Sequence, residues 1–349
     1  MDKATGILNP ELSPQVILRA FSRALDQARV HEGATGPNPP VGCVLLDAQG
    51  QELASGVHRR AGQPHAEAEA IAQARAAGVA EKIDSVVVTL EPCNHHGRTP
   101  PCAEAILTTG ARQVWIACSD PNPKVAGGGA ERLRAAGLSV KFLSELDHPS
   151  APSLLVEADR LLAPFSKRVR TGLPFITIKQ AISTSGSMMP DTGQKTFTSA
   201  PSLELAHRLR RRADAILTGS GTVLADDPLF TVRLVPDHPH NQRMLILLDR
   251  RRRISEDYLH AARLRGFAVH LADDVHEALE VIGAAGGMEV LIEAGPTLTR
   301  HLLAVGLWDE YVLIEQAANA DGTDRVTLRR NPAPQFHSRG KARDVLGHH

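Results

Sequence analysis

The hydrophobic positions of the first 145 residues follow two different periods. Between Pro14 and Val30 they follow the spacing of an amphipathic helix. Short apolar runs, several of them β-branched, predict strands, and Ala- and Glu-rich stretches between them predict helices. The predicted strands are 41–46, 53–58, 85–90, 113–118 and 139–143, and the predicted helices are 66–77, 102–109 and 127–136. This alternation favours a layered α/β/α fold.

A cluster of Pro and Ser at 147–152 separates this pattern from a second one. We expect a connecting helix over 154–167 that is interrupted at Pro164, because proline removes a helical hydrogen bond. From Pro174 onward strands are predicted at 175–180, 215–218, 244–248, 268–271, 290–293 and 311–315. Helices are predicted between them, for instance at 202–212, 275–284 and 298–305. The predicted organisation is a domain at 1–147, a connecting segment at 148–173 and a second α/β domain at 174–349.

Composition and charge limit the classes of function that this chain could have. A length of 349 residues is typical of two domains. Lys and Arg together number 39, as do Asp and Glu, so the net charge offers no electrostatic footprint for nucleic acid. No apolar run approaches the roughly 18 residues of a membrane span, and the N-terminus lacks the pattern of a signal peptide. We therefore expect a cytoplasmic protein that acts on a small molecule, without a nucleic-acid or membrane partner.

The most specific chemical signal is a set of residues suited to zinc. His65, Cys93 and Cys102 offer one imidazole and two thiols, which leaves a fourth position on the metal for water. All three lie at or just before predicted helix N-termini, where the helix dipole favours a thiolate. Glu67 follows His65 by two residues and can move protons to and from that water. This pattern is typical of zinc deaminases, in which an activated water attacks a ring carbon that bears an amino group.

Simpler interpretations of these residues remain open at this point. A structural zinc site usually has four protein ligands, and no fourth cysteine stands at a suitable spacing. Glu67 could be an ordinary first-turn glutamate that supports the helix dipole. Cys43 and Cys118 lie in apolar, strand-like runs and are interpreted as core residues, which fits a reducing compartment better than a disulfide framework.

The motifs of the N-terminal half resemble those of the bifunctional riboflavin-biosynthesis deaminase/reductase family, the RibD family. They are PNPPVG at 37–42, PHAE at 64–67, TLEPCNHHGRTPPC at 89–102 and DPNPKVAG at 120–127. The resemblance implies a cytidine-deaminase-like α/β/α domain that binds zinc. It also implies hydrolytic deamination of 2,5-diamino-6-(5-phosphoribosylamino)pyrimidin-4-one to the corresponding uracil. Asn38, His58 and His95 would then line the substrate pocket, although Asn38 could be only a turn residue and the two histidines could lie on the surface.

The second half resembles the reductase domain of the same family, with matches at 168–174, 214–228, 231–233 and 293–298. This implies a dihydrofolate-reductase-like α/β domain that uses NADPH to reduce the ribosyl group to ribityl. By position, six residues would contact the cofactor: Lys179, Thr222, Asp226, Gly295, Pro296 and Thr297. Three would contact the substrate: Arg210, Arg233 and Glu293. The arginines suit its phosphate, although Arg210 could lie on a solvated helix face and Asp226 could mark only a turn.

The reductase half also departs from the family pattern. Ala181 replaces a glycine, Ser185 replaces an aspartate, and Arg250 replaces a short residue. The segment 193–198 lacks the usual tryptophan, the loop at 315–319 lacks a proline, and no closing strand is predicted in the polar tail after Pro334. These departures predict a weak or inactive reductase.

Two alternative functions remain open, and the first of them follows from these departures. One is a deaminase alone, which feeds a riboflavin-like branch such as pyrimidotriazine antibiotic synthesis, with the C-terminal half a non-catalytic binding or dimerisation module. The other is a nucleoside or RNA-base deaminase. A homodimer or higher homo-oligomer is expected in each case.

Overall fold

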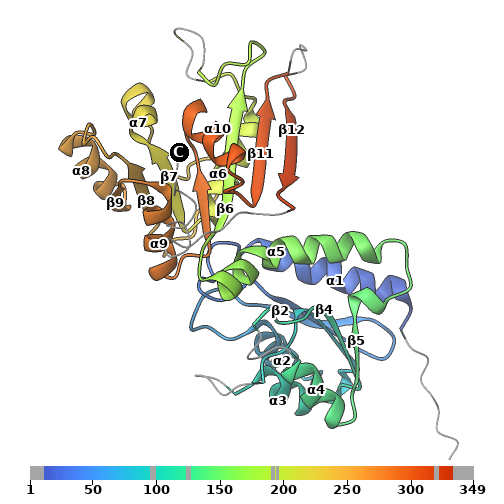
Figure 1. Cartoon of the computed structure of the whole chain (residues 1–349). Helices are drawn as coiled ribbons and strands as arrows, with labels where there is room; N and C mark the ends of the chain where they lie inside the picture. The colour runs from blue at the N-terminus through green and yellow to red at the C-terminus, as the bar shows by residue number, and fades with distance from the viewer. Residues whose placement is uncertain are drawn as a thin grey trace, which may run out of the picture. The chain divides into compact units, whose positions relative to one another are not determined.

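The computed structural model describes residues 12–94, 100–122, 127–189, 193, 196–317 and 322–332. Contacts divide the chain into two compact units, Met1–Arg170 and Thr171–His349, and each unit is a sheet with helices on both faces (Figure 1). The predicted α/β fold class is therefore confirmed. None of the helices in the described part of the chain has both the length and the hydropathy needed to cross a membrane.

The first unit is built on a five-stranded sheet of order β2-β1-β3-β4-β5. Its strands are β1 (Gly42–Leu46), β2 (Glu52–Val57), β3 (Ser85–Leu90), β4 (Gln113–Cys118) and β5 (Ser139–Phe142). The β1 strand pairs antiparallel with β2 and β3, and the remaining pairs are parallel. One face packs on α1 (Pro14–Arg29) and α5 (Ala151–Thr171), and the other on α2 (Ala66–Ala76), α3 (Cys102–Leu107) and α4 (Gly128–Ala135) (Figure 1).

Two glycines of the β1–β2 hairpin let helices approach this sheet closely. A Cβ atom on Gly42 would lie 2.0 Å from the carbonyl oxygen of Ala24 in α1, and one on Gly56 would lie 2.2 Å from that of Ala66 in α2. No side chain fits such a gap. Because Ala66 is the first residue of α2, the contact at Gly56 holds the start of this helix, and with it His65, against the sheet.

The helix α5 corrects one prediction, because it runs from Ala151 to Thr171 without a break at Pro164. An internal proline costs a helix about 3 kcal/mol. The apolar face of α5 buries Ala158, Leu161 and Leu162, and burial of aliphatic side chains is worth roughly 1.5–3 kcal/mol each for the larger ones. Packing on the first unit therefore outweighs the lost hydrogen bond.

The second unit is built on a seven-stranded sheet of order β12-β11-β6-β10-β7-β8-β9. Its strands are β6 (Phe175–Ile182), β7 (Ala215–Gly219), β8 (Met244–Leu248), β9 (Ala268–Ala272), β10 (Glu289–Ile292), β11 (Glu310–Glu315) and β12 (Arg325–Arg330). All pairs are parallel except β11 with β12. One face packs on α9 (Val275–Ala284) and α10 (Pro296–Ala304), and the other on α6 (Ala200–Arg212), α7 (Ser220–Asp226) and α8 (Glu256–Leu264).

The strand β12 was missing from the prediction, which also gave no bounds for the helices α7 and α8. The helices α7 and α8 are short, and β12 is an edge strand in which Val326 and Leu328 alternate with polar residues but remain exposed, so this short pattern does not mark a buried strand. The strand β12 therefore completes the sheet before Pro334, and the tail in which no strand was predicted comes after it. Asp226 ends α7, and Asp227 adopts a left-handed conformation with φ of 42°.

Candidate functional site

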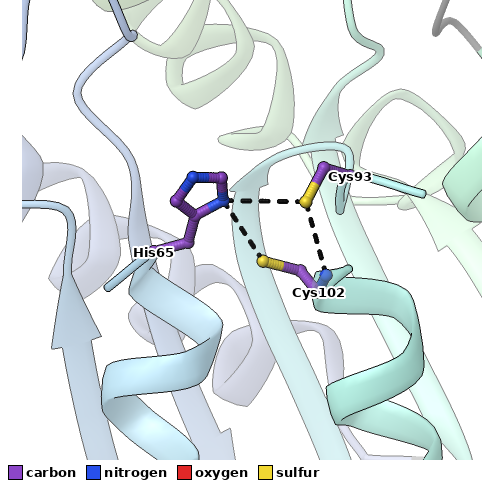
Figure 2. A group of neighbouring side chains, drawn as sticks. All are labelled: His65, Cys93 and Cys102. Atoms are coloured by element: carbon purple, nitrogen blue, oxygen red, sulfur yellow. Dashed lines mark hydrogen bonds between the residues drawn. The ribbon is translucent and has the colours of Figure 1, made fainter. Parts of the chain in front are cut away.

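The three predicted metal ligands meet at the carboxyl end of β3. His65 is the N-cap residue of α2, Cys102 begins α3, and Cys93 lies in the segment after β3. The His65 Nδ1 atom lies 3.6 Å from the Cys93 Sγ atom and 3.4 Å from the Cys102 Sγ atom, and Figure 2 shows the imidazole facing both sulfurs. All three ligand atoms lie within 4.8 Å of one another. A tetrahedral zinc ion separates such N and S ligands by roughly 3.5–3.8 Å, so the cluster has the size of a zinc site.

The electrostatics of the two thiols also fit a cation. A hydrogen bond from Cys102 lowers the pKa of Cys93 to about 4, and bonds from His65 and from the Cys102 backbone N–H act in the same direction. The bond to Cys93, together with burial, raises the pKa of Cys102 above its usual value. The pair therefore resists a second negative charge. A divalent cation removes this conflict, because it stabilises thiolates directly.

Glu67 lies in the first turn of α2 and is 3% exposed. Burial raises the pKa of its carboxyl group, which lies within hydrogen-bonding reach of the Cys102 thiol. A glutamate that only supported the helix dipole would not need to be buried beside metal-ligand residues. A carboxyl group with a raised pKa is suited to accept and return protons near neutral pH.

Two of the three predicted pocket residues lie beside this cluster. The rings of His58 and His65 pack edge to face with centroids 5.2 Å apart. The His58 Nδ1 atom lies 3.0 Å from the Pro64 carbonyl oxygen and so carries the proton, which leaves Nε2 to accept from the Asn38 amide at 3.2 Å. Burial lowers the pKa of His58. At 2% exposure His58 is no surface histidine, whereas His95 lies outside the described residues.

In the second unit, a cavity of about 260 Å³ opens beside β6 and α6. Three predicted site residues line it, namely Lys179, Arg210 and Arg233. Ala181 and the residues 196–198, which belong to stretches that depart from the family pattern, also line it, so these departures fall in the cavity wall.

Glu293, which follows β10, joins Lys179 and Arg210 in a buried ion-pair network. Its Oε2 atom lies 2.9 Å from Lys179 Nζ. Arg210 donates from Nε to Oε1 at 2.5 Å and from Nη2 to Oε2 at 2.9 Å. Burial alone would raise the pKa of Glu293, but the charges of Lys179 and Arg210 hold it well below its usual range. The Nε/Nη2 edge of the Arg210 guanidinium is thus taken by Glu293, and its Nη1 atom donates to the Thr231 carbonyl oxygen at 3.4 Å, whereas Arg233 is exposed.

Four of the predicted cofactor residues, Thr222, Gly295, Pro296 and Thr297, lie just after the ends of β7 and β10, which are side by side in the parallel sheet. The Thr222 hydroxyl oxygen accepts a hydrogen bond from the Gly295 N–H at 3.0 Å. Pro296 and Thr297 form the first turn of α10, where free backbone N–H groups favour an anionic group such as a pyrophosphate. Asp226, the last residue of α7, is exposed.

One residue of this cavity, His207, was missed by the sequence reasoning. It is buried and lies one turn before Arg210 in α6. Its Nδ1 atom accepts hydrogen bonds from the backbone N–H groups of Arg233 at 2.8 Å and Leu234 at 3.4 Å. Burial, reinforced by the charges of Arg210 and Arg233, lowers the pKa of His207 to about 4. The sequence feature that could have identified His207 is its spacing of three residues from Arg210, because this spacing puts both side chains on one face of the helix.

Two family models match this chain. The cytidine and deoxycytidylate deaminase zinc-binding region matches residues 15–118, and the RibD C-terminal domain matches residues 174–316. The first match contains the zinc-ligand cluster, and the second contains the ion-pair network around Glu293.

Relatives match across both units. The riboflavin biosynthesis protein RibD of Escherichia coli strain K12 is 35% identical over 90% of this chain and 93% of its own length. The RibD protein of Mycobacterium tuberculosis strain H37Rv is 39% identical over 82% and 81%. Among solved structures, Acinetobacter baumannii RibD has 30% identity and a TM-score of 0.71 over 94% of this chain and 93% of its own. A Thermotoga maritima diaminohydroxyphosphoribosylaminopyrimidine deaminase/5-amino-6-(5-phosphoribosylamino)uracil reductase has 28% identity and a TM-score of 0.74 over 89% and 90%.

Proposed function

The chain belongs to the RibD family of bifunctional deaminase/reductases of riboflavin biosynthesis, and from this premise we propose which residues carry out its two reactions. The protein deaminates 2,5-diamino-6-(5-phosphoribosylamino)pyrimidin-4-one to 5-amino-6-(5-phosphoribosylamino)uracil and releases ammonia. It then reduces the ribosyl group to ribityl with NADPH. The deaminase-only alternative is not favoured, because the relatives and the reductase family model cover the C-terminal half. For the same reason, the prediction of a weak or inactive reductase is no longer supported.

The deaminase proposal is carried by one observation, the three ligand atoms within 4.8 Å of one another beside the buried Glu67. We assign His65, Cys93 and Cys102 as the zinc ligands. When bound, zinc acts as a Lewis acid that lowers the pKa of water at its open position. Glu67 would take one proton from that water and pass it to the ring nitrogen, and would then take the remaining hydroxyl proton and pass it to the departing ammonia.

Asn38 and His58 hold the pyrimidine in this proposal. The His58 Nε2 atom engages the Asn38 side-chain N–H, so the Asn38 carbonyl oxygen is the acceptor that remains for the substrate. The carbonyl of Pro64 fixes the His58 ring in turn. His95 is assigned to the same pocket from the family resemblance alone.

In the reductase half, we assign the sugar phosphate to the exposed Arg233. Arg210, whose Nε and Nη2 atoms face Glu293, then serves to orient that carboxylate, which also pairs with Lys179. Glu293 and Lys179 thereby present fixed polar groups to the ribosyl chain and the cofactor. The remaining cofactor contacts are assigned to Thr222, Asp226, Gly295, Pro296 and Thr297.

We also propose that the enzyme works in the cytoplasm as a homodimer or higher homo-oligomer. Its four cysteines are all free, which suits a reducing compartment. The edge strand β12 exposes Val326 and Leu328, and an exposed apolar edge favours pairing with another chain. Size-exclusion chromatography with light scattering tests the assembly, and a monomer at micromolar concentration would contradict it.

A coupled assay tests the two activities together. Purified protein given the diaminopyrimidinone should accumulate the ribosylaminouracil without NADPH and convert it to the ribityl product with NADPH, with about one zinc per chain by elemental analysis. Full deamination by metal-free protein would refute the zinc assignment. Absence of NADPH oxidation on the authentic ribosylaminouracil would instead restore the interpretation of a spent reductase.

A further inference from the structure

Glu91 is a buried glutamate at the carboxyl end of β3 to which the proposed chemistry gives no role. It is 4% exposed. Its Oε2 atom accepts hydrogen bonds from the backbone N–H groups of Asp120 at 3.3 Å and Gly127 at 3.2 Å, and its Oε1 atom accepts from the N–H of Ala130 at 3.1 Å. Ala130 lies in the first turn of α4, where N–H groups lack helical partners and the helix dipole favours a negative group. Glu91 therefore ties the end of β3 to the start of α4.

The residues that follow Glu91 pack directly on α4. A Cβ atom on Gly129 would lie only 1.8 Å from the Pro92 carbonyl oxygen, so the two backbones touch there with no space for a side chain. A Cβ atom on the neighbouring Gly128 would lie 3.8 Å from the Asn94 side chain, which is an ordinary contact. Cys93 stands between Pro92 and Asn94, so the first turn of α4 supports the segment that carries this ligand.

We propose that Glu91 is a positioning residue for the metal ligand Cys93. The carboxylate holds segment 91–94 on α4 from one side. From the other side, the Cys102 N–H donates to the Cys93 Sγ atom at 3.3 Å and the Ala103 N–H donates to the Cys93 carbonyl oxygen at 3.1 Å. Held between these two supports, the thiol faces His65. Groups that orient metal ligands typically change metal affinity 10- to 100-fold when they are mutated.

The test compares the two ends of the same strand. Asp84 directly precedes β3, is 6% exposed and accepts from the Arg112 guanidinium at 2.6 Å, so it matches Glu91 in burial but serves no metal ligand. Glu91→Gln places an amide donor against backbone donors. We expect it to weaken zinc binding roughly 10- to 100-fold, measured by competition with a chromogenic chelator well below the melting temperature. Asp84→Asn should lower the melting temperature and leave the zinc Kd unchanged.

Neighbouring glycines supply a second matched pair, which keeps the test decisive if Glu91→Gln does not fold. Gly129→Ala must displace the Pro92 carbonyl and should weaken zinc binding, whereas Gly128→Ala should leave zinc binding unchanged. The inference rests on the proposed zinc site. Absence of zinc binding in the unmutated protein would overturn both the zinc site and this inference. An unchanged zinc affinity in Glu91→Gln or in Gly129→Ala would overturn only the role of Glu91.

Discussion

The two halves of this protein stabilise buried charge in opposite ways. Around Glu293, one carboxylate is compensated by two cations of the chain itself, Lys179 and Arg210. Around Cys93, the described residues supply thiols, a carboxyl group and imidazoles but no lysine or arginine that pairs with the ligand atoms. The reductase network is complete as a protein structure, whereas the deaminase cluster needs an added cation.

This difference predicts separate sensitivities for the two activities. Deamination should depend on metal and on the one group that moves protons. Reduction should depend on an ion-pair network in which removal of one partner leaves the others uncompensated. The predictions below test this contrast in order of decreasing effect.

Loss of the metal should separate the two activities completely. We expect Cys93→Ser, or exhaustive chelation, to abolish deamination while NADPH-dependent reduction of the supplied ribosylaminouracil continues, because the reductase network contains its own cations. Ammonia release and NADPH absorbance report the two reactions. Cys118→Ser, outside the cluster, is the control. An equal loss of both activities would show that the halves are not independent.

Glu67→Gln should retain zinc and lower the deamination rate by ~10²–10⁴-fold, because the amide cannot carry protons. The rate is measured as ammonia release at saturating substrate, with zinc content determined on the same sample. Glu69→Gln, in the same helical turn, is the control. A rate within a few-fold of wild type would assign proton transfer to another group.

Glu293→Gln should destabilise the second unit by roughly 3–5 kcal/mol, because Lys179 and Arg210 would then share a buried site without their carboxylate. Urea unfolding measures the change. The exposed pair of Glu204 with Arg208 gives the matched control, since Glu204→Gln should cost about 0.3–0.5 kcal/mol. Similar values for the two variants would contradict a buried, self-compensated network.

The smallest effect should come from pH. The folded-state pKa of His207 is about 4, below the unfolded value of about 6.5. Between these values the unfolded chain binds more protons, so His207 stabilises the fold fully above pH ~6.5 and loses this contribution as the pH falls toward 4. Thermal unfolding at pH 7 and pH 5 should show a smaller drop for His207→Gln than for wild type. The exposed His240→Gln should behave as wild type, and identical drops for all three proteins would refute the prediction.

The predictions from sequence succeeded where the pattern of a short stretch of residues is enough to favour one secondary structure. Strand runs such as 85–90 and the helix that begins at Pro14 follow from hydrophobic period alone. They failed at Pro164, where packing overrides the local cost of proline, and at β12, which exists because β11 offers it a partner.

The sequence by itself determined the fold class and proposed the metal ligands and the proton carrier, because these depend on the identity and short-range spacing of a few residues. Only the tertiary structure decided which groups meet across long separations. Arg210 lies 83 residues from the carboxylate that it orients, and Glu91 lies 39 residues from the farthest amide that it binds. Such contacts depend on which strands pair and which helices cover them, and that choice is made by the packing of the whole core.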